Sequence, residues 1–227
     1  MYPYEEHNIY ISIGLIEMKI DAVVLSWKRP DNLDKIIRSL KDQKVIGTIY
    51  VWHNYPSQKK VEGAINIYSE KNFDTYIRHI FAMALDSDYI LFQDDDLIVD
   101  GDNSDVILSY IRKYGKRAAV MGPFGKKYSR KQESVVILGR MHIVKREYLI
   151  YPILFEKEYK YKRDKTIGDD IFLNLSIQHF TQSKSIVMKE LKTKNLPESN
   201  CAKAVKRRWW EKRKRIARKI INAMPQR

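Results

Sequence analysis

Apolar and polar positions alternate along the chain in blocks that predict strands and helices in turn. The apolar, β-branched run 20–26 has the pattern of a strand buried on both faces. Leu33, Ile36, Ile37 and Leu40 then recur at the spacing of one helix face. Similar blocks predict strands at 48–53, 64–69, 89–93, 118–122, 134–138 and 140–145, and helices at 73–85, 104–113 and 169–180.

This alternation predicts an α/β domain with a mixed, mostly parallel sheet flanked by helices. We expect three parts: a polar lead at 1–17, the α/β domain at 18–200, and a basic amphipathic C-terminal helix at 201–227. In open parallel sheets, ligands bind beyond the carboxyl ends of the strands. The turns that follow the first four predicted strands are therefore where functional residues are expected.

Composition narrows the class of protein. Of the 227 residues, 44% are hydrophobic and 31% are charged, which is typical of a soluble globular protein. Cys201 is the only cysteine, which excludes an intramolecular disulfide and argues against a thiolate zinc site. No apolar run approaches the roughly 20 residues that span a bilayer, and the first residues carry acids where a signal peptide carries lysines. We expect a cytoplasmic protein, with a peripheral position on the inner membrane face as the alternative.

The charge is unevenly distributed. The formal net charge is +14, yet residues 201–227 hold eleven Lys and Arg against one Glu. Attraction to anionic partners is therefore expected mainly from this tail.

The stretch YILFQDDDLIVDGD (89–102) places five aspartates directly after an apolar run. Asp94, Asp95 and Asp96 stand where the strand is predicted to end. Three adjacent carboxylates repel one another and are costly to desolvate, and a divalent cation relieves both effects. Oxygen ligands favour Mg²⁺ or Mn²⁺, which commonly share their sites with substrate phosphates. The alternative is an acidic surface loop.

Five segments give the chain a resemblance to a known family. VVLSWKRPDNL, IYVWHN, NFDTYIR, YILFQDDDLIVD and IGDDIFLNLSIQHFTQSKSIVM occur in this order between residues 20 and 190. In these segments the chain resembles the GT-A glycosyltransferases, and most closely the exostosin-type catalytic domain. The resemblance implies a Rossmann-like nucleotide-diphospho-sugar transferase fold. It also implies metal-dependent transfer of a sugar from a nucleotide-sugar donor, with a UDP-sugar as the first choice.

The resemblance also implies roles for single residues. The residues implied to bind the nucleotide sugar are Arg29, Asn54, Asn72, Arg78, Asp94 and Asp95. Asp96, together with Asp94, is implied to hold Mn²⁺ or Mg²⁺. Each of these residues also has a plainer interpretation, as a turn, cap or surface residue.

Asp169 and Asp170 are the implied catalytic pair. Asp169 stands where the family has Glu, so its side chain is one methylene shorter. If the sugar is transferred with inversion, Asp170 is the expected general base; with retention, it orients the acceptor and stabilises positive charge. Alternatively, both aspartates cap the predicted helix at 169–180.

Cations and aromatic residues alternate in FEKEYKYKRDK (155–165), just before the acidic pair. We expect Lys160, Tyr161, Lys162 and Arg163 to bind an anionic acceptor. The alternative is a solvated basic loop.

The tail combines an apolar stripe with tryptophans and cations. Such a helix is expected to bind an anionic membrane surface or nucleic acid, unless its tryptophans pack on the domain itself. The residues expected to make this contact are Arg207, Arg208, Trp209, Trp210, Lys212 and Arg213.

The main hypothesis is therefore a glycosyltransferase that acts on an anionic or membrane-associated glycan or lipid. One alternative is a transferase that acts on hydroxylated bases of modified DNA. Another is a non-catalytic basic module that binds nucleic acid or membranes.

Overall fold

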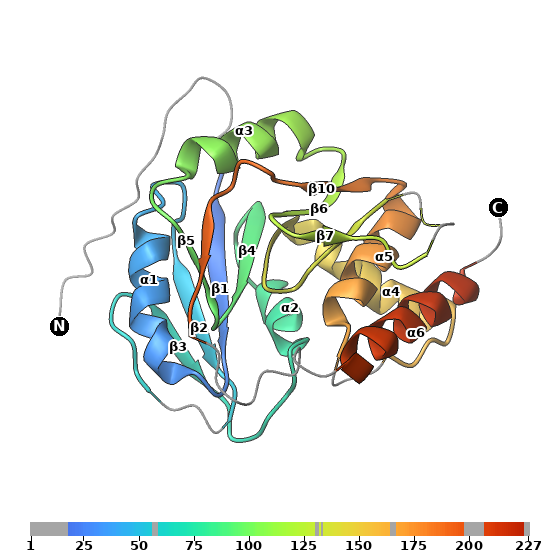
Figure 1. The fold of residues 1–227 in the computed structure, drawn as a ribbon, viewed down its shortest axis with the longest axis horizontal. Coiled ribbons are helices and arrows are strands. Elements are labelled where there is room, and N and C mark those ends of the chain that lie inside the picture. Colours follow the sequence, from blue (N-terminus) through green and yellow to red (C-terminus); the bar gives the residue numbers. More distant parts are fainter. Residues whose placement is uncertain are drawn as a thin grey trace.

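The computed structural model describes residues 18–55, 59–129, 132, 134–163, 167–197 and 207–224. Its main sheet has the strand order β10-β6-β9-β4-β1-β2-β3 (Figure 1). These strands are β1 (Ile20–Ser26), β2 (Ile49–His53), β3 (Ile65–Tyr68), β4 (Tyr89–Asp94), β6 (Ala118–Gly122), β9 (Met141–Lys145) and β10 (Lys184–Val187). Two small antiparallel pairs accompany the sheet: β5 (Leu97–Val99) with β11 (Thr193–Asn195), and β7 (Gly125–Lys126) with β8 (Val136–Ile137).

The main sheet is mixed but mostly parallel. Strand β1 pairs in parallel with β2 and β4, β2 with β3, and β6 with β10, whereas β9 runs antiparallel to β4 and β6. The helices are α1 (Leu33–Lys41), α2 (Ile77–Ala82), α3 (Ser104–Tyr114), α4 (Tyr151–Glu158), α5 (Asp169–Thr181) and α6 (Arg207–Ala223), with 3-10 turns at Pro30–Asn32 and Arg146–Ile150. The predicted fold class, a mostly parallel α/β sheet flanked by helices, is confirmed.

The core lies on both faces of the sheet, as the unbroken apolar pattern of β1 requires. Ala22 and Val24 of β1 pack in the cluster that contains the apolar faces of α1 and α3. Val23 points to the opposite face, into the cluster that contains residues of α2 and α5. Burial on both sides holds the carboxyl end of β1 rigidly in the middle of the sheet.

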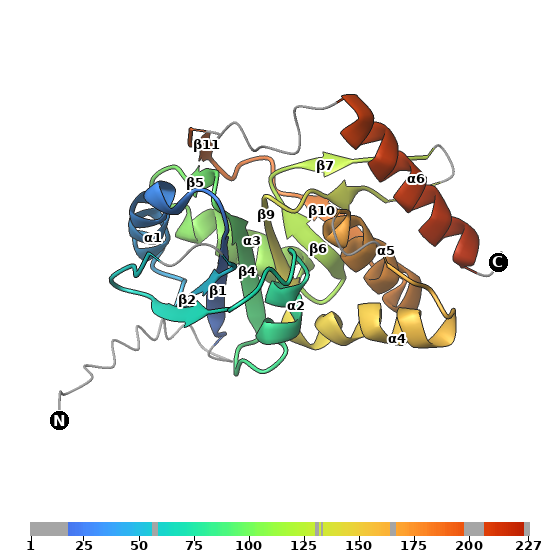
Figure 2. The ribbon, with the colours of Figure 1, turned by 90° about the horizontal axis from the view of Figure 1, so that it is seen from below.

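Helix α6 lies against α5, at the end of the molecule away from β3 (Figures 1 and 2). Its residues Ile216, Ala217 and Ile220 are buried in a third apolar cluster with residues of α5. The apolar stripe of the tail is therefore covered by the domain and does not face outward. None of the helices in the described part of the chain is both long and apolar enough to cross a bilayer.

Helix α4 was not anticipated from the sequence. Its residues 155–158 belong to the basic segment 155–165, for which no helix was predicted. Helix α4 buries Phe155 completely against Phe172 of α5, with the two ring centroids 5.6 Å apart. The first half of that basic segment therefore contributes to the core.

Candidate active site

A cavity of about 410 Å³ opens at the carboxyl ends of β1, β2 and β4. The parallel register pairs Leu25 of β1 with Asp94 of β4, so the turns that follow these two strands meet. The cavity is lined by all nine residues that the sequence predicted for the nucleotide sugar, the metal and catalysis: Arg29, Asn54, Asn72, Arg78, Asp94, Asp95, Asp96, Asp169 and Asp170. The two of these nine residues that are farthest apart in the chain, Arg29 and Asp170, are separated by 141 positions.

The turn after β1 is bound to the aspartates after β4. Arg29 Nε donates to Asp95 Oδ1 (2.7 Å), and the backbone N–H of Trp27 donates to Asp95 Oδ2 (3.0 Å). Arg29 Nη1 also donates to Asp96 Oδ2 (2.9 Å). Burial raises the pKa of Asp95, while Arg29 and the Trp27 N–H oppose that rise. Asp95 therefore mainly fixes the position of Arg29, because its side chain is only 4% exposed.

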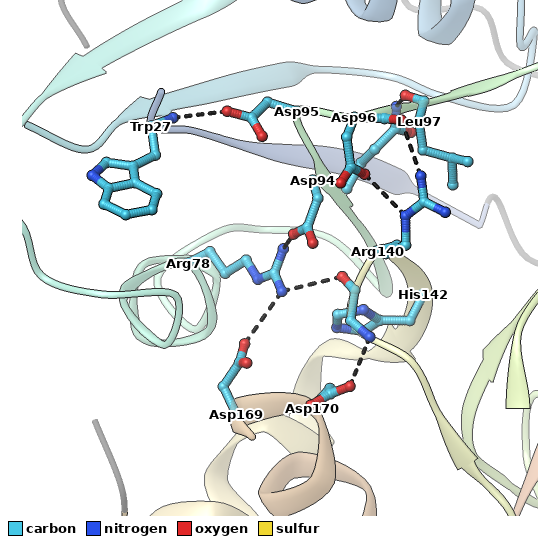
Figure 3. A network of polar contacts seen from close by, with 12 residues as sticks. Trp27, Arg78, Asp94, Asp95, Asp96, Leu97, Arg140, His142, Asp169 and Asp170 are labelled. Carbon is cyan, nitrogen blue, oxygen red and sulfur yellow. Dashed lines mark hydrogen bonds and ion pairs between the residues drawn. The ribbon is translucent and has the colours of Figure 1, made fainter. Parts of the chain in front are cut away.

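Arg140 is a functional candidate that was not predicted from the sequence. Its Nε donates to Asp96 Oδ1 and its Nη2 to the Asp96 backbone carbonyl, both at 3.0 Å (Figure 3). Arg140 directly precedes β9, and its carbonyl accepts from the Asp94 N–H (2.8 Å). Antiparallel pairing of β9 with β4 brings it to the cavity, and no local sequence signal reveals that pairing.

Arg78 lies between Asp94 and Asp169 (Figure 3). Its Nη1 donates to Asp94 Oδ1 (2.5 Å), and its Nη2 donates to Asp169 Oδ2 and the Gly139 carbonyl (both 3.2 Å). Burial raises the pKa of Asp94 to about 6, although Arg78 opposes this; the nearby carboxylates of Asp96, Asp169 and Asp95 add to the rise. Arg78 thus joins the end of β4 to the start of α5.

Asp170 is deeply buried and held on both oxygens. Its Oδ2 accepts from the Gly139 N–H (2.9 Å) and from Arg213 Nη2 (2.5 Å), and its Oδ1 accepts from the Ile171 N–H (2.9 Å). Arg213 Nε also donates to Tyr128 Oη (2.9 Å). Burial opposes the charge of Arg213, but Asp170 outweighs it and the pKa of Arg213 is raised. The Asp170–Arg213 ion pair therefore ties α6 to α5 at the cavity.

This pairing corrects one prediction. Arg213 was expected on a surface that contacts a membrane or nucleic acid, but it is 4% exposed and lines the cavity. Its position on the buried face of α6, between Trp209 and Ala217 at four-residue spacing, is the sequence signal that was available.

Two glycines permit the close packing around Asp170. Gly168 directly precedes α5 with φ +87°, a conformation that other residues rarely adopt, and a Cβ there would meet Ile216 Cδ1 at 3.2 Å. A Cβ on Gly139 would lie 3.2 Å from Asp170 Cβ and 3.3 Å from Arg78 Nη2. A side chain at Gly139 would therefore displace Asp170 or Arg78, and one at Gly168 would press on Ile216 of α6.

Asn54 and Asn72 hold each other at the far wall of the cavity. Asn54 Nδ2 donates to Asn72 Oδ1 (2.8 Å), and Asn54 Oδ1 accepts from the Phe73 N–H (2.8 Å). Asn72 Oδ1 also accepts from the Asp74 N–H (2.8 Å). These contacts fix the loops after β2 and β3 in relation to each other.

The first turns of α6 form another wall of the cavity. Trp209 and Trp210 line it, with Lys126 Nζ 3.6 Å from the ring centroid of Trp210. Their packing on the domain is the alternative that the sequence left open for the tail. Lys212 is exposed on a different face of α6, and the side chains of Arg207 and Arg208 lie outside the described part of the structure.

The predicted acceptor residues do not line this cavity. Tyr161 stacks on Phe172 in the core, with ring centroids 5.3 Å apart, and Lys160 is exposed. Lys162 and Arg163 line a second, smaller pocket beside α6. The sequence placed these residues near the acidic pair, but the structure separates them from the cavity that contains it.

The donor set of the cavity is compatible with a hard divalent cation. Asp94 and Asp96 both line the cavity, and 28% of the Asp94 side chain is exposed. Within the described ranges, no group of three or more His, Cys, Asp or Glu gathers as a complete metal site. Mg²⁺ and Mn²⁺ are usually held by one or two carboxylates together with phosphate oxygens, so two carboxylates suffice. Arg29 and Arg140 now occupy both oxygens of Asp96, and a cation would displace at least one of them.

No protein-family model and no curated protein sequence matches the chain. Its fold is similar to that of S. aureus TarS, with a TM-score of 0.50 and 12% identity over 79% of this chain. It is also similar to S. aureus TarS 1-349 in complex with UDP, with a TM-score of 0.51 and 12% identity over 78% of this chain. The chain spans 37% and 60% of the lengths of these two structures. The similarity supports a GT-A-like fold, and at this identity it extends to the fold alone.

Proposed function

We propose that this protein is a glycosyltransferase that moves a sugar from a nucleotide-diphosphate sugar to an acceptor hydroxyl. A UDP-sugar is the preferred donor, because one structure of similar fold contains UDP. The observation that carries the proposal is the convergence of nine predicted site residues on one cavity at the carboxyl ends of the strands. In folds of this class, that edge of the sheet is where nucleotides bind.

The arginines of the cavity suit a diphosphate. Arg29, Arg78 and Arg140 each contribute a guanidinium to the carboxylates after β4, and planar guanidiniums bind phosphate oxygens as readily as carboxylates. When the bond between the sugar and the diphosphate breaks, negative charge develops on the leaving phosphate. Positive groups fixed in advance at that place lower the barrier of this step.

Mn²⁺ or Mg²⁺ is part of the proposal, with Asp96 and Asp94 as its protein ligands. When bound, such an ion neutralises the developing charge on the diphosphate. The neighbouring arginines would then pair with phosphate oxygens in place of Asp96.

The two aspartates at the start of α5 have different surroundings. Asp170 is buried and both its oxygens already accept hydrogen bonds, which suits a residue that orients other groups and provides fixed negative charge near the reacting carbon. The Asp169 side chain is 13% exposed and lines the cavity. Asp169 is therefore the carboxylate that an acceptor hydroxyl can reach.

The test is thermal unfolding of the parent protein and the Asp96→Asn variant, with UDP, Mn²⁺, or both. UDP with Mn²⁺ should raise the Tm of the parent, since a ligand at 100 times its Kd stabilises by about 2.7 kcal/mol. The variant should lose the Mn²⁺-dependent part of that shift. Asp100→Asn, an exposed aspartate that does not line the cavity, is the matched control and should behave as the parent.

Two outcomes would count against the proposal. A parent protein that UDP does not stabilise under any condition removes the nucleotide site. An equal Mn²⁺-dependent shift in the parent and in Asp96→Asn removes the metal from Asp96.

A further inference from the structure

The large cavity has a polar part and an aromatic part. The polar part is built from the loops after β1 to β4, which carry the paired arginines and aspartates together with Asn54 and Asn72. The aromatic part is built from α6 and from the residue before β7, which contribute Trp209, Trp210 and Phe124. Helix α6 lies at the end of the molecule away from β3 (Figures 1 and 2). The aromatic part is therefore on the side of the cavity away from Asn54 and Asn72.

The two tryptophans are held in place before any ligand arrives. Their rings lie edge to face, with centroids 4.6 Å apart and an interplanar angle of 85°. The guanidinium carbon of Arg213 lies 4.6 Å from the Trp209 ring centroid, and Lys126 Nζ lies 3.6 Å from that of Trp210. Lys126 is not among the residues that line the cavity, so it contacts Trp210 from outside. Both rings are thus fixed in orientation, half-buried and presented to the cavity.

A single side chain connects this aromatic wall to the acidic pair. Arg213 Nη2 donates to Asp170 Oδ2 (2.5 Å), and the same guanidinium lies over the Trp209 ring. Asp169, the next residue along α5, lines the cavity with an accessible carboxylate. A ligand ring that packs on the tryptophans would therefore have its edge near Asp169.

The donor does not need this part of the cavity. Its diphosphate is expected at Arg29, Arg78 and Arg140, in the polar part. Arg213 is a cation of the aromatic part, and it is already paired with Asp170. An apolar wall beside an accessible carboxylate suits a ligand with one apolar face and hydroxyl groups at its rim. A pyranose ring has this form, and the negative face of an aromatic ring attracts its polarised C–H groups.

We propose that Trp209 and Trp210 form an acceptor subsite, where the apolar face of a pyranose ring packs on the tryptophans and one of its hydroxyls points to Asp169. The inference rests on the proposed transferase function, because it places the acceptor of that reaction and names it as a carbohydrate. Bases of a nucleic acid also stack on aromatic rings. A nucleic acid strand, however, would bring phosphates close to Asp169 and Asp170, which repel them.

The test measures the binding of trisaccharides by saturation-transfer difference NMR, which detects weak binding and identifies the ligand protons nearest the protein. The probes are trisaccharides of glucose, of N-acetylglucosamine and of galacturonic acid, each with and without UDP and Mn²⁺. The parent is compared with Trp210→Leu and Trp210→Phe. Trp52→Leu is the matched control, since Trp52 of β2 is half-buried and is not part of the cavity lining.

At least one trisaccharide should bind the parent, with the largest signals from the C–H protons of one ring face. Trp210→Leu should weaken this binding by about tenfold, because it removes an aromatic surface and its stacking energy. Trp210→Phe keeps an aromatic face and should recover part of the loss, and Trp52→Leu should bind as the parent does. The rise in Tm with UDP and Mn²⁺ should be the same in the parent and in both Trp210 variants, which also shows that these variants fold.

Failure of all three trisaccharides to bind the parent, or equal affinity in the parent and Trp210→Leu, would overturn the subsite. Trp210-dependent binding of a single-stranded DNA oligonucleotide that is tighter than that of every trisaccharide would also overturn it, and would assign the wall to nucleobases.

The outcomes for the subsite and for the proposed transferase can be told apart. Stabilisation by UDP without trisaccharide binding would keep the donor site and remove the subsite. Trp210-dependent trisaccharide binding in a protein that UDP does not stabilise would support the carbohydrate site and remove the donor site.

Discussion

Two pockets lie on neighbouring sides of helix α6, and their charges are arranged in opposite ways. In the large cavity, five aspartates are paired with four arginines, so the charges nearly cancel. In the second pocket, five cations converge without an acidic residue among the described lining. The first set of charges is largely buried, whereas the cations that α6 contributes to the second pocket are exposed.

The difference has a structural basis. The paired charges come from loops and strand ends that the sheet brings together, and most of them are shielded from water, where an unpaired charge is costly. The cations that α6 contributes to the second pocket stand on its exposed side, where water solvates them. Burial therefore required pairing in the cavity, while exposure allowed the second pocket to remain positively charged.

The largest effect on stability is expected when one partner of a buried ion pair is removed. Arg213→Met should lower the free energy of unfolding by about 3–5 kcal/mol, because Asp170 would remain buried without its countercharge. Urea unfolding measures the loss. Lys212→Met, an exposed neighbour, should change it by less than about 0.5 kcal/mol.

A double variant tests whether the loss of stability comes from the unpaired charge of Asp170. Arg213→Met combined with Asp170→Asn leaves no unpaired charge and should recover part of the lost stability. Equal destabilisation by the Arg213 and Lys212 substitutions would mean that the ion pair does not stabilise the fold.

The titration of Asp94 should change the free energy of unfolding with pH, and this change is expected to be of intermediate size. Its pKa is raised to about 6 in the folded protein, from 3.8, so the folded state binds more protons than the unfolded state between these values. Stability contributed by the protonated form is therefore lost as the pH rises from about 4 to about 6. Relative to Asp94→Asn, the parent should lose about 1–3 kcal/mol over this range.

Urea unfolding of both proteins at several pH values between 4 and 7 measures that difference. A constant difference across the range would mean that Asp94 titrates normally, which is not expected for a half-buried carboxylate beside three others.

The smallest expected effect concerns the second pocket. The variant Lys212→Gln, Arg215→Gln, Lys219→Gln should gain about 0.5 kcal/mol in stability at low salt, since like-charge pairs on a helix cost about 0.2–0.5 kcal/mol each. The gain should fade in about 1 M salt, which screens surface charge. A loss of stability at low salt would mean that the contacts of these three cations stabilise the fold by more than their mutual repulsion destabilises it.

The sequence alone predicted the fold class and most of the elements of the sheet. Apolar patterns report burial directly, and burial on both faces of β1 is visible in every residue of 20–26. The rule that ligands bind at the carboxyl ends of parallel strands then selected the loops that line the cavity. Helix α4 and the short strands β5, β7, β10 and β11 were not predicted, because brief segments have too little periodicity to be read.

Only the tertiary structure decided which charges are neighbours. Arg140 and Asp96 are 44 residues apart, and Arg213 and Asp170 are 43 apart. The sequence around a residue does not indicate such a pair. The partner depends on how strands and helices pack, and not on the neighbours of the residue in the chain. The same packing made the first turns of α6 a wall of the cavity and placed Lys212, Arg215 and Lys219 in one pocket with Lys162 and Arg163.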